Sequence, residues 1–365
     1  MTKDEYKIWV KEIKEKLPGF LLQMNGKHKK GFYNYSLSGD IFSEKFNWGL
    51  GNSVFVLKIY RSLNLIPENL PEITDFIQNF QKPGKEFYDP IIKYASFPVR
   101  VYTFLKEQDK NRLNHKFIRR AETRQAISAL KLFNIEPEYE YKDFPQTEKD
   151  IELFLENLNW KIPWGAGSHF SALMFFLAVS KLDNKLELIH FAVNHIEKYR
   201  QKDGCWYKDN PSLQLKINGA MKIITGLKAA ASLANYNNGK VVFDKVNELI
   251  NTSLQATNDK NACSNFNLIY TLRYANELSE GNYRYNEIEE FIMQRLDIYK
   301  QFYFEKYGAF SFLKNKSNSK YYGAVISKGK NEPDIHGTVM FLWGLAVIGN
   351  FWGINDEVGL FEFIT

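Results

Sequence analysis

The chain has 365 residues, of which 44% are hydrophobic and 16% aromatic, which is ample for a large core and excludes a disordered or fibrous protein. The formal net charge of +6 is mild for this length, and we expect the basic residues to be scattered over the surface. Such a charge argues against nucleic-acid binding and indicates at most a preference for an anionic substrate. Two cysteines exclude a disulfide-rich scaffold.

The N-terminal segment is charged and amphipathic, and it lacks the apolar run of a signal peptide. The apolar stretch at 339–348 is too short to span a bilayer. We therefore expect a cytoplasmic protein without an integral membrane segment.

Two kinds of predicted helix alternate along the chain, and this repeat is the most informative feature of the sequence. Helices with one charged face are predicted at 3–16, 70–81, 147–158, 184–200, 242–255 and 284–303. Helices that are more apolar and richer in small residues are predicted at 51–63, 117–133, 168–181, 217–233, 264–277 and 335–349, and those in 217–233 and 335–349 are apolar nearly all round. Longer loops are predicted at 82–116 and 304–334.

A helix that is apolar all round must be buried on every side, whereas a helix with a charged face lies outside. Strand-like alternation is nearly absent, so no substantial sheet is expected. The pattern predicts an all-α protein, an (α/α)6 toroid of six outer–inner helix pairs in a single domain over 1–365. An open solenoid of helix pairs is the alternative, but solenoids keep shorter and more uniform turns.

Three short motifs carry a family resemblance. The segment 201–206 (QKDGCW) resembles the Q-x-x-x-G-x-W turn of squalene and terpenoid cyclases, and 307–312 (YGAFSF) is similar to a degenerate second copy. The segment 334–338 (DIHGT) resembles the stretch that opens the last inner helix of protein prenyltransferase β subunits. The resemblance implies the α/α-toroid fold, with an enzyme site in its central cavity.

The catalytic motifs of those families are missing. Neither D-x-D-D nor D-D-x-x-D occurs, so the acid of the cyclases and the magnesium ligands of the synthases have no counterpart. The prenyltransferase resemblance would make Cys263 and His336 zinc ligands, but Asn261 stands where that family has Asp. We expect no metal or other cofactor, and buried inert thiols at both cysteines.

Polar residues gather where the apolar helices begin, and a closed ring would bring these first turns to one mouth, where helix N-termini favour anions. The predicted catalytic residues are Glu122, His169, Asp203, Asp334 and His336. The predicted ligand-binding residues are Trp48, Arg119, Arg124, Trp164, Trp206, Asn218, Asn265 and Tyr322. His336 is the leading candidate, because Asp334 is close enough to orient its imidazole as an acid or base.

Structural roles compete with these assignments. Asp334 and Ser168 are also candidate helix N-caps, and Glu122 with Arg119 has the spacing of an ion pair on one helix. Trp206 is more typical of a packing residue than of a ligand contact.

Three functions remain open from the sequence, and the motif resemblance favours the first of them. The first is a cyclase- or prenyltransferase-like enzyme acting on a prenyl or polycyclic substrate among aromatic rings. The second is a glycan-active toroid, a polysaccharide lyase or a glycoside hydrolase, in which Trp48, Trp164 and Trp206 stack on sugars. The third is a non-catalytic toroid that binds a peptide or protein.

Overall fold

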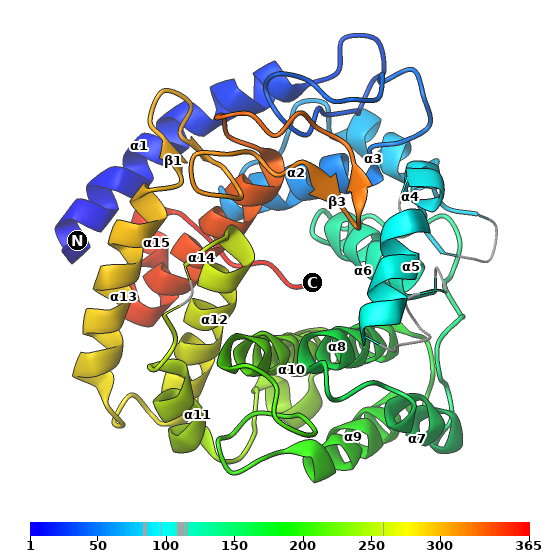
Figure 1. The fold of residues 1–365 in the computed structure, drawn as a ribbon, viewed down its shortest axis with the longest axis vertical. Coiled ribbons are helices and arrows are strands. Elements are labelled where there is room, and N and C mark those ends of the chain that lie inside the picture. Colours follow the sequence, from blue (N-terminus) through cyan, green and yellow to red (C-terminus); the bar gives the residue numbers. More distant parts are fainter. Residues whose placement is uncertain (83–85, 96, 108–112, 114–115, 258) are drawn as a thin grey trace. The chain divides into compact units, whose positions relative to one another are not determined.

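A computed structural model describes residues 1–82, 86–95, 97–107, 113, 116–257 and 259–365 (Figure 1). The helices are α1 (Lys3–Met24), α2 (Leu50–Ser62), α3 (Leu70–Gln78), α4 (Pro90–Ala95), α5 (Phe97–Glu107), α6 (Lys116–Lys131), α7 (Glu148–Glu156), α8 (Pro163–Val179), α9 (Lys185–Ile196), η2 (Glu197–Tyr199), α10 (Leu213–Ala234), η3 (Tyr236–Gly239), α11 (Val246–Ser253), α12 (Ala262–Leu278), α13 (Tyr285–Lys300), α14 (Ile335–Trp352) and α15 (Asn355–Val358). Two antiparallel hairpins are formed by β1 (Tyr303–Phe304) with β2 (Ala309–Phe310) and by β3 (Lys320–Tyr321) with β4 (Ala324–Val325). The prediction of a mainly helical chain is confirmed.

Each of the predicted helices has a counterpart, but some boundaries were wrong. The helix α8 begins at Pro163, five residues before its predicted start, because proline suits the first turn of a helix. Ser168 therefore lies inside α8 and is not its N-cap. The stretch 82–116, predicted as a loop, holds α4 and α5, while 83–85, 96, 108–112 and 114–115 lie outside the described residues.

The chain divides into two compact units. Unit 1 comprises 1–142, 259–266 and 293–363, and unit 2 comprises 143–258, 267–292 and 364–365. The predicted single domain and the predicted closed ring both depend on how these two units are arranged, so both stay predictions.

The core of unit 1 is built around α2, which packs against α3, α6 and α14. The helix α14 is apolar nearly all round, as predicted for a core helix. Contrary to the expectation from 339–348, its full length does meet the length and composition of a bilayer-crossing helix, with a mean hydropathy of 1.3. Since 72% of that window is buried within the protein, core packing accounts for its composition.

The core of unit 2 is the pair α8 and α10, which lie side by side in Figure 1, with α9 packed on α8 and on α7. Glycines allow the two helices to approach closely. A Cβ atom at Gly167 would lie 2.8 Å from the Gly219 carbonyl oxygen, and one at Gly226 would lie 2.9 Å from the Ser171 Cα. The small residues of α8 and α10, which led us to predict inner helices there, therefore allow these two helices to pack closely.

The turn 201–206 joins this unit's helices through its backbone. Gly204 has a φ of +80°, and a Cβ atom there would lie 2.7 Å from the backbone nitrogen of Leu249 in α11. Thr252 on the same helix donates a hydrogen bond to the Asp203 carbonyl oxygen at 2.9 Å. A glycine is thus required both by its conformation and by the close approach of α11.

Replacing Gly204 with Ala is expected to lower the free energy of unfolding by about 1–3 kcal/mol, through backbone strain and the clash with α11. Gly281 is a matched control, because its φ is +68° but no atom lies within 4 Å of the Cβ position. Urea denaturation of both variants measures the difference. Equal losses for Gly204→Ala and Gly281→Ala would show that the contact with α11 contributes nothing.

Candidate active site

Asp334 caps the N-terminus of α14 and ties a neighbouring loop to it. Its Oδ1 accepts the N–H of Gly337 at 2.7 Å, and its Oδ2 accepts those of Phe312 and Asn318 at 2.8 and 2.9 Å. Burial raises the pKa of Asp334 to about 7, and these backbone N–H groups oppose the rise. The N-cap role is confirmed, and both oxygens are engaged by backbone groups rather than by the His336 ring.

Replacing Asp334 with Ala is expected to lower the free energy of unfolding by about 1–3 kcal/mol, because several buried N–H groups lose their acceptor. The comparison is Thr147→Ala in α7, an exposed N-cap whose hydroxyl accepts from Asp150 N–H, for which about 0.5–1 kcal/mol is expected. Denaturant titration of both variants measures this. A loss at Asp334 no larger than that at Thr147 would contradict the role in holding the loop.

His336, in the first turn of α14, is oriented by Tyr35 instead of Asp334. The Tyr35 hydroxyl lies 3.1 Å from Nδ1, and Asn318 Nδ2 donates to the same hydroxyl at 3.1 Å. The imidazole is stacked on Phe55, with ring centroids 4.8 Å apart and planes 17° apart, and the Phe312 ring lies at 4.6 Å. A half-buried imidazole is thus held in one orientation, by the contact at Nδ1 and by the two phenylalanine rings.

Glu122, on the first half of α6, is a buried carboxyl with one unsatisfied oxygen. Its Oε2 accepts the Asp89 N–H at 3.1 Å, whereas its Oε1 has no hydrogen-bond partner among the described residues. The side chain is 1% exposed. Burial first, and the Asp89 charge second, raise the pKa of Glu122 well above its usual value. This environment favours a neutral carboxylic acid that can donate a hydrogen bond or a proton.

Asp89 is the carboxyl neighbour of that acid, and it was not among the predicted site residues. It accepts the N–H groups of Gly49 and Leu50, at the start of α2, at 2.7 and 3.1 Å, and that of Ile91 at 3.0 Å. Burial raises the pKa of Asp89 to about 6, while these N–H groups oppose the rise. Its position before Pro90, where α4 begins, was the available signal, since Asp-Pro marks turns and helix starts.

Two tyrosines of the β3–β4 hairpin lie within reach of the Glu122 charge, and one of them contacts Phe55, on which His336 stacks. Tyr321 meets Phe55 edge-on, with ring centroids 6.1 Å apart, and the Tyr322 ring lies 4.6 Å from that of Tyr321. Burial chiefly, and the Glu122 charge in addition, raise the pKa of both phenols. We call the side chains of Tyr35, Glu122, Tyr321, Tyr322 and His336 the Glu122–His336 cluster.

The predicted ion pair between Glu122 and Arg119 is replaced by another. Arg119 Nη1 lies 3.0 Å from Glu86 Oε1, and its guanidinium lies over the Tyr88 ring. Arg124 is 2% exposed, and its positive charge acts to lower the pKa of Tyr322. Arg124 is therefore the arginine whose charge reaches the cluster.

The other predicted site residues of unit 1 have structural contacts. Trp48 is 1% exposed, and its Nε1 donates to the Ser43 carbonyl oxygen. Asn265 is fully buried, and its Nδ2 donates to the backbone oxygens of Asp259 and Asn261. Neither residue presents a free face to a ligand in this structure.

In unit 2, Asp203 and Trp206 stabilise the turn that holds them. Asp203 Oδ2 accepts the Tyr207 hydroxyl at 2.9 Å and the Lys216 ammonium at 3.0 Å. Trp206 is 1% exposed, with the Arg200 guanidinium 4.0 Å from its ring centroid. The packing role predicted for Trp206 is what the structure shows.

Three further predicted residues of unit 2 have different degrees of exposure. Trp164 is 38% exposed, so of the three tryptophans proposed to stack on sugars it alone has an accessible ring. His169 is 7% exposed. Asn218 is buried and its Oδ1 accepts from Asn267 and Gln214, both at 2.8 Å. Their convergence with His336 at one mouth involves both units and stays a prediction.

Zinc finds no set of ligands in the described ranges, where no three His, Cys, Asp or Glu side chains are grouped so that they could hold a metal ion. The expectation of a buried thiol is wrong for Cys263, which is half-buried, and its charge contributes to the raised pKa of Tyr35 and Tyr322. Burial raises the pKa of Cys205, in agreement with an inert thiol there.

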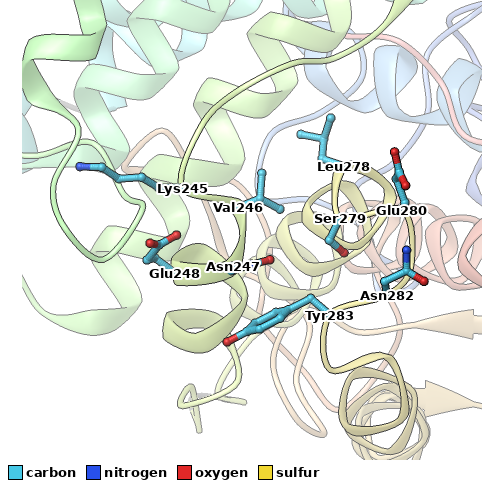
Figure 2. Close-up of a pocket in the computed structure, with 9 residues that line it drawn as sticks. All are labelled: Lys245, Val246, Asn247, Glu248, Leu278, Ser279, Glu280, Asn282 and Tyr283. Carbon is cyan, nitrogen blue, oxygen red and sulfur yellow. The ribbon is translucent and has the colours of Figure 1, made fainter.

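An open pocket of about 620 Å³ lies in unit 2, between the start of α11 and the connection from α12 to α13 (Figure 2). Figure 2 shows charges of both signs around it, from Lys245, Glu248 and Glu280, together with the Tyr283 ring. The Tyr283 hydroxyl is already hydrogen-bonded to Asn251. With no predicted site residue on its walls, this pocket is a weaker candidate than the Glu122–His336 cluster.

No protein-family model matches this chain, and no curated protein or solved structure matches it either. The resemblance to toroid enzymes therefore rests on the short sequence motifs alone.

Proposed function

We propose that this protein is an acid–base enzyme acting on a glycan, and that the Glu122–His336 cluster is its active site. Two observations carry the proposal: a buried carboxyl whose Oε1 has no hydrogen-bond partner among the described residues, and an imidazole held by Tyr35. Tyr321 relates the two, since it contacts the Phe55 ring on which His336 stacks and lies within reach of the Glu122 charge. A carboxyl whose environment favours the neutral acid and an imidazole that can take up a proton are together what is needed to give a proton to one atom and remove one from another.

The reaction this pairing suits best is β-elimination from a uronate-containing polysaccharide. When Nδ1 of His336 donates to the Tyr35 oxygen, Nε2 carries the lone pair that takes the proton next to the substrate carboxylate. The electrons of that C–H bond form the new C=C bond, and the C–O bond to the leaving sugar breaks. Glu122 gives its proton to the leaving oxygen, and solvent returns both side chains to their starting states.

Hydrolysis of a glycosidic bond is the alternative within the same substrate class. Asp89 and Glu122 form a neighbouring pair of carboxyls, and burial raises the pKa of both. Asp89 is held by three backbone N–H groups, which suits an anchor better than a nucleophile. We therefore favour elimination over hydrolysis.

A cyclase- or prenyltransferase-like activity has support from the aromatic rings of Phe55 and Phe312, which could shelter a carbocation. The acid of the cluster argues against it. A raised pKa makes Glu122 a weak proton donor toward an alkene, and the imidazole of His336 would remove a proton from a carbocation. We therefore rank this second.

We also propose that the helix pairs belong to an (α/α)6 toroid in one domain, as the repeat of the sequence predicts, and that the protein is cytoplasmic and binds no nucleic acid. The toroid is supported by the succession of helices along the chain and by the apolar composition of α8 and α14, which are mostly buried. An experimental structure in which the first and last helix pairs are not in contact would contradict it.

The test is a substrate screen with the purified full-length chain. Acidic and neutral polysaccharides are assayed for new reducing ends and for the ultraviolet absorbance of unsaturated products, and prenyl diphosphates are assayed by mass spectrometry. Elimination predicts both signals on an acidic polysaccharide. Reducing ends without absorbance indicate hydrolysis, and turnover of prenyl diphosphates alone refutes the glycan assignment.

A further inference from the structure

The positive charge of this protein is concentrated in one segment, contrary to the expectation of scattered basic residues. Residues 90–120 contain eight basic and two acidic residues, and the rest of the chain contains 40 of each. The whole formal excess of +6 therefore arises from these 31 residues. They include α4, α5 and the start of α6, all in unit 1.

The helix α5 within this segment has its polarity reversed relative to a normal surface helix. Its outward side chains include Phe97, Tyr102 and Leu105, which are 60%, 65% and 61% exposed, and Val99 at 38%. Its inward side includes Arg100, which is 8% exposed and donates to the Leu113 carbonyl oxygen at 3.2 Å. A helix that buries its arginine and exposes large apolar side chains is not explained by packing within the unit.

We propose that the outer face of α5, formed by Phe97, Val99, Tyr102 and Leu105, docks on the surface of an anionic phospholipid bilayer. A bilayer interface takes apolar and aromatic side chains into its acyl boundary while its headgroups attract neighbouring Lys and Arg residues. Both features coincide here. Lys106 is exposed at the end of the same helix, and Lys116 is exposed at the start of α6.

Charge decides between this occupant and two others. A second copy of this chain would bring two segments of the same positive charge together, which costs free energy. A soluble anionic polymer would be attracted by the charge but would leave four large apolar side chains in water. The anionic bilayer satisfies both the charge and the apolar face.

Docking by α5 would place the candidate active site near the membrane surface, since α4 packs against β4 of the hairpin that carries Tyr321. The docking proposal does not depend on the reaction proposed above. It stands or fails on binding measured in the absence of any substrate.

The experiment is co-sedimentation of the full chain with two kinds of vesicle, phosphatidylcholine alone and an equal mixture of phosphatidylcholine and phosphatidylserine. We expect binding to the anionic vesicles only, weakened by high salt. The variant Phe97→Ser/Tyr102→Ser/Leu105→Ser is expected to bind at least about tenfold more weakly, because the inserting side chains are lost. Lys106→Glu with Lys116→Glu is expected to weaken binding in the same direction.

The matched control is Ile8→Ser/Leu22→Ser on α1, where the two side chains are 70% and 71% exposed. This variant is expected to bind vesicles like the natural chain, and circular dichroism confirms that every variant is folded. The proposal is overturned if the natural chain binds neither vesicle, if the control loses binding equally, or if dextran sulfate is bound and vesicles are not. Self-association without lipid that the α5 variant abolishes would assign the face to a second copy.

Discussion

Replacing His336 with Gln is expected to lower kcat on the glycan substrate by about 10²–10⁴-fold, the usual contribution of a positioned acid–base group. Glutamine is close in size and polar, so stacking between Phe55 and Phe312 is partly kept while proton transfer at Nε2 is lost. Steady-state kinetics on the substrate found in the screen measures the effect.

Tyr35→Phe separates positioning from catalysis. It removes the hydroxyl that holds Nδ1 of His336 and leaves the imidazole in place, so a smaller loss of kcat than for His336→Gln is expected. KM is expected to change little in either variant. Unchanged kcat in His336→Gln, with the protein folded, would remove the imidazole from the mechanism.

Replacing Glu122 with Gln is expected to abolish most turnover and yet stabilise the protein at neutral pH. The amide can still accept the Asp89 N–H but has no proton to transfer. A loss of kcat of about 10²–10⁴-fold is expected, together with an increase in Tm of about 2 °C or more. Thermal unfolding at pH 7 and pH 4, alongside kinetics, measures both effects.

The sign of the stability change follows from the direction of the pKa shift. The pKa of Glu122 is raised well above 4.5 in the folded chain, so the unfolded chain releases this proton first as pH rises. Ionisation in the unfolded state lowers folding stability above that pH, and the cost grows until the folded pKa is reached. The gain in Tm from Glu122→Gln is therefore expected at pH 7 and not at pH 4, where both states are protonated.

Glu86→Gln is the matched control for Glu122→Gln. Glu86 is also a buried carboxyl at the edge of the same region, but Arg119 pairs with it at 3.0 Å. Turnover is expected to remain near that of the natural chain. If Glu122→Gln and Glu86→Gln lose activity equally, Glu122 has no special role as an acid.

The helices and one cap could be predicted because their signals are local. Apolar periodicity located α2, α6 and α14, and the Asp334 N-cap is confirmed, since capping needs only residues adjacent in sequence. The prediction of Ser168 as an N-cap was wrong, because α8 begins earlier, at Pro163. The glycines between Pro163 and Ser168 made a helix start there hard to predict. The exposed apolar face of α5 could not be predicted, because the sequence pattern of exposed apolar residues on a helix is the same as that of buried ones.

Glu122 and His336 were predicted as site residues from charge and polarity at the start of apolar helices, whereas their partners were not. Tyr35 lies 301 positions from His336 in the sequence, and Asp89 lies 33 from Glu122. No local pattern indicates such a pairing. The Tyr35 contact replaces the expected one from Asp334, whose oxygens accept backbone N–H groups instead.

The protonation state of Glu122 is the property from which the proposed chemistry follows. It can be measured by ¹³C NMR on protein with labelled glutamate carboxyls, the Glu122 signal being identified as the one missing from Glu122→Gln. The expected result is a carboxyl that keeps its proton well above pH 4.5. A Glu122 signal that titrates at or below the usual 4.5 would show an ionised carboxylate, and the cluster would then have no proton to give.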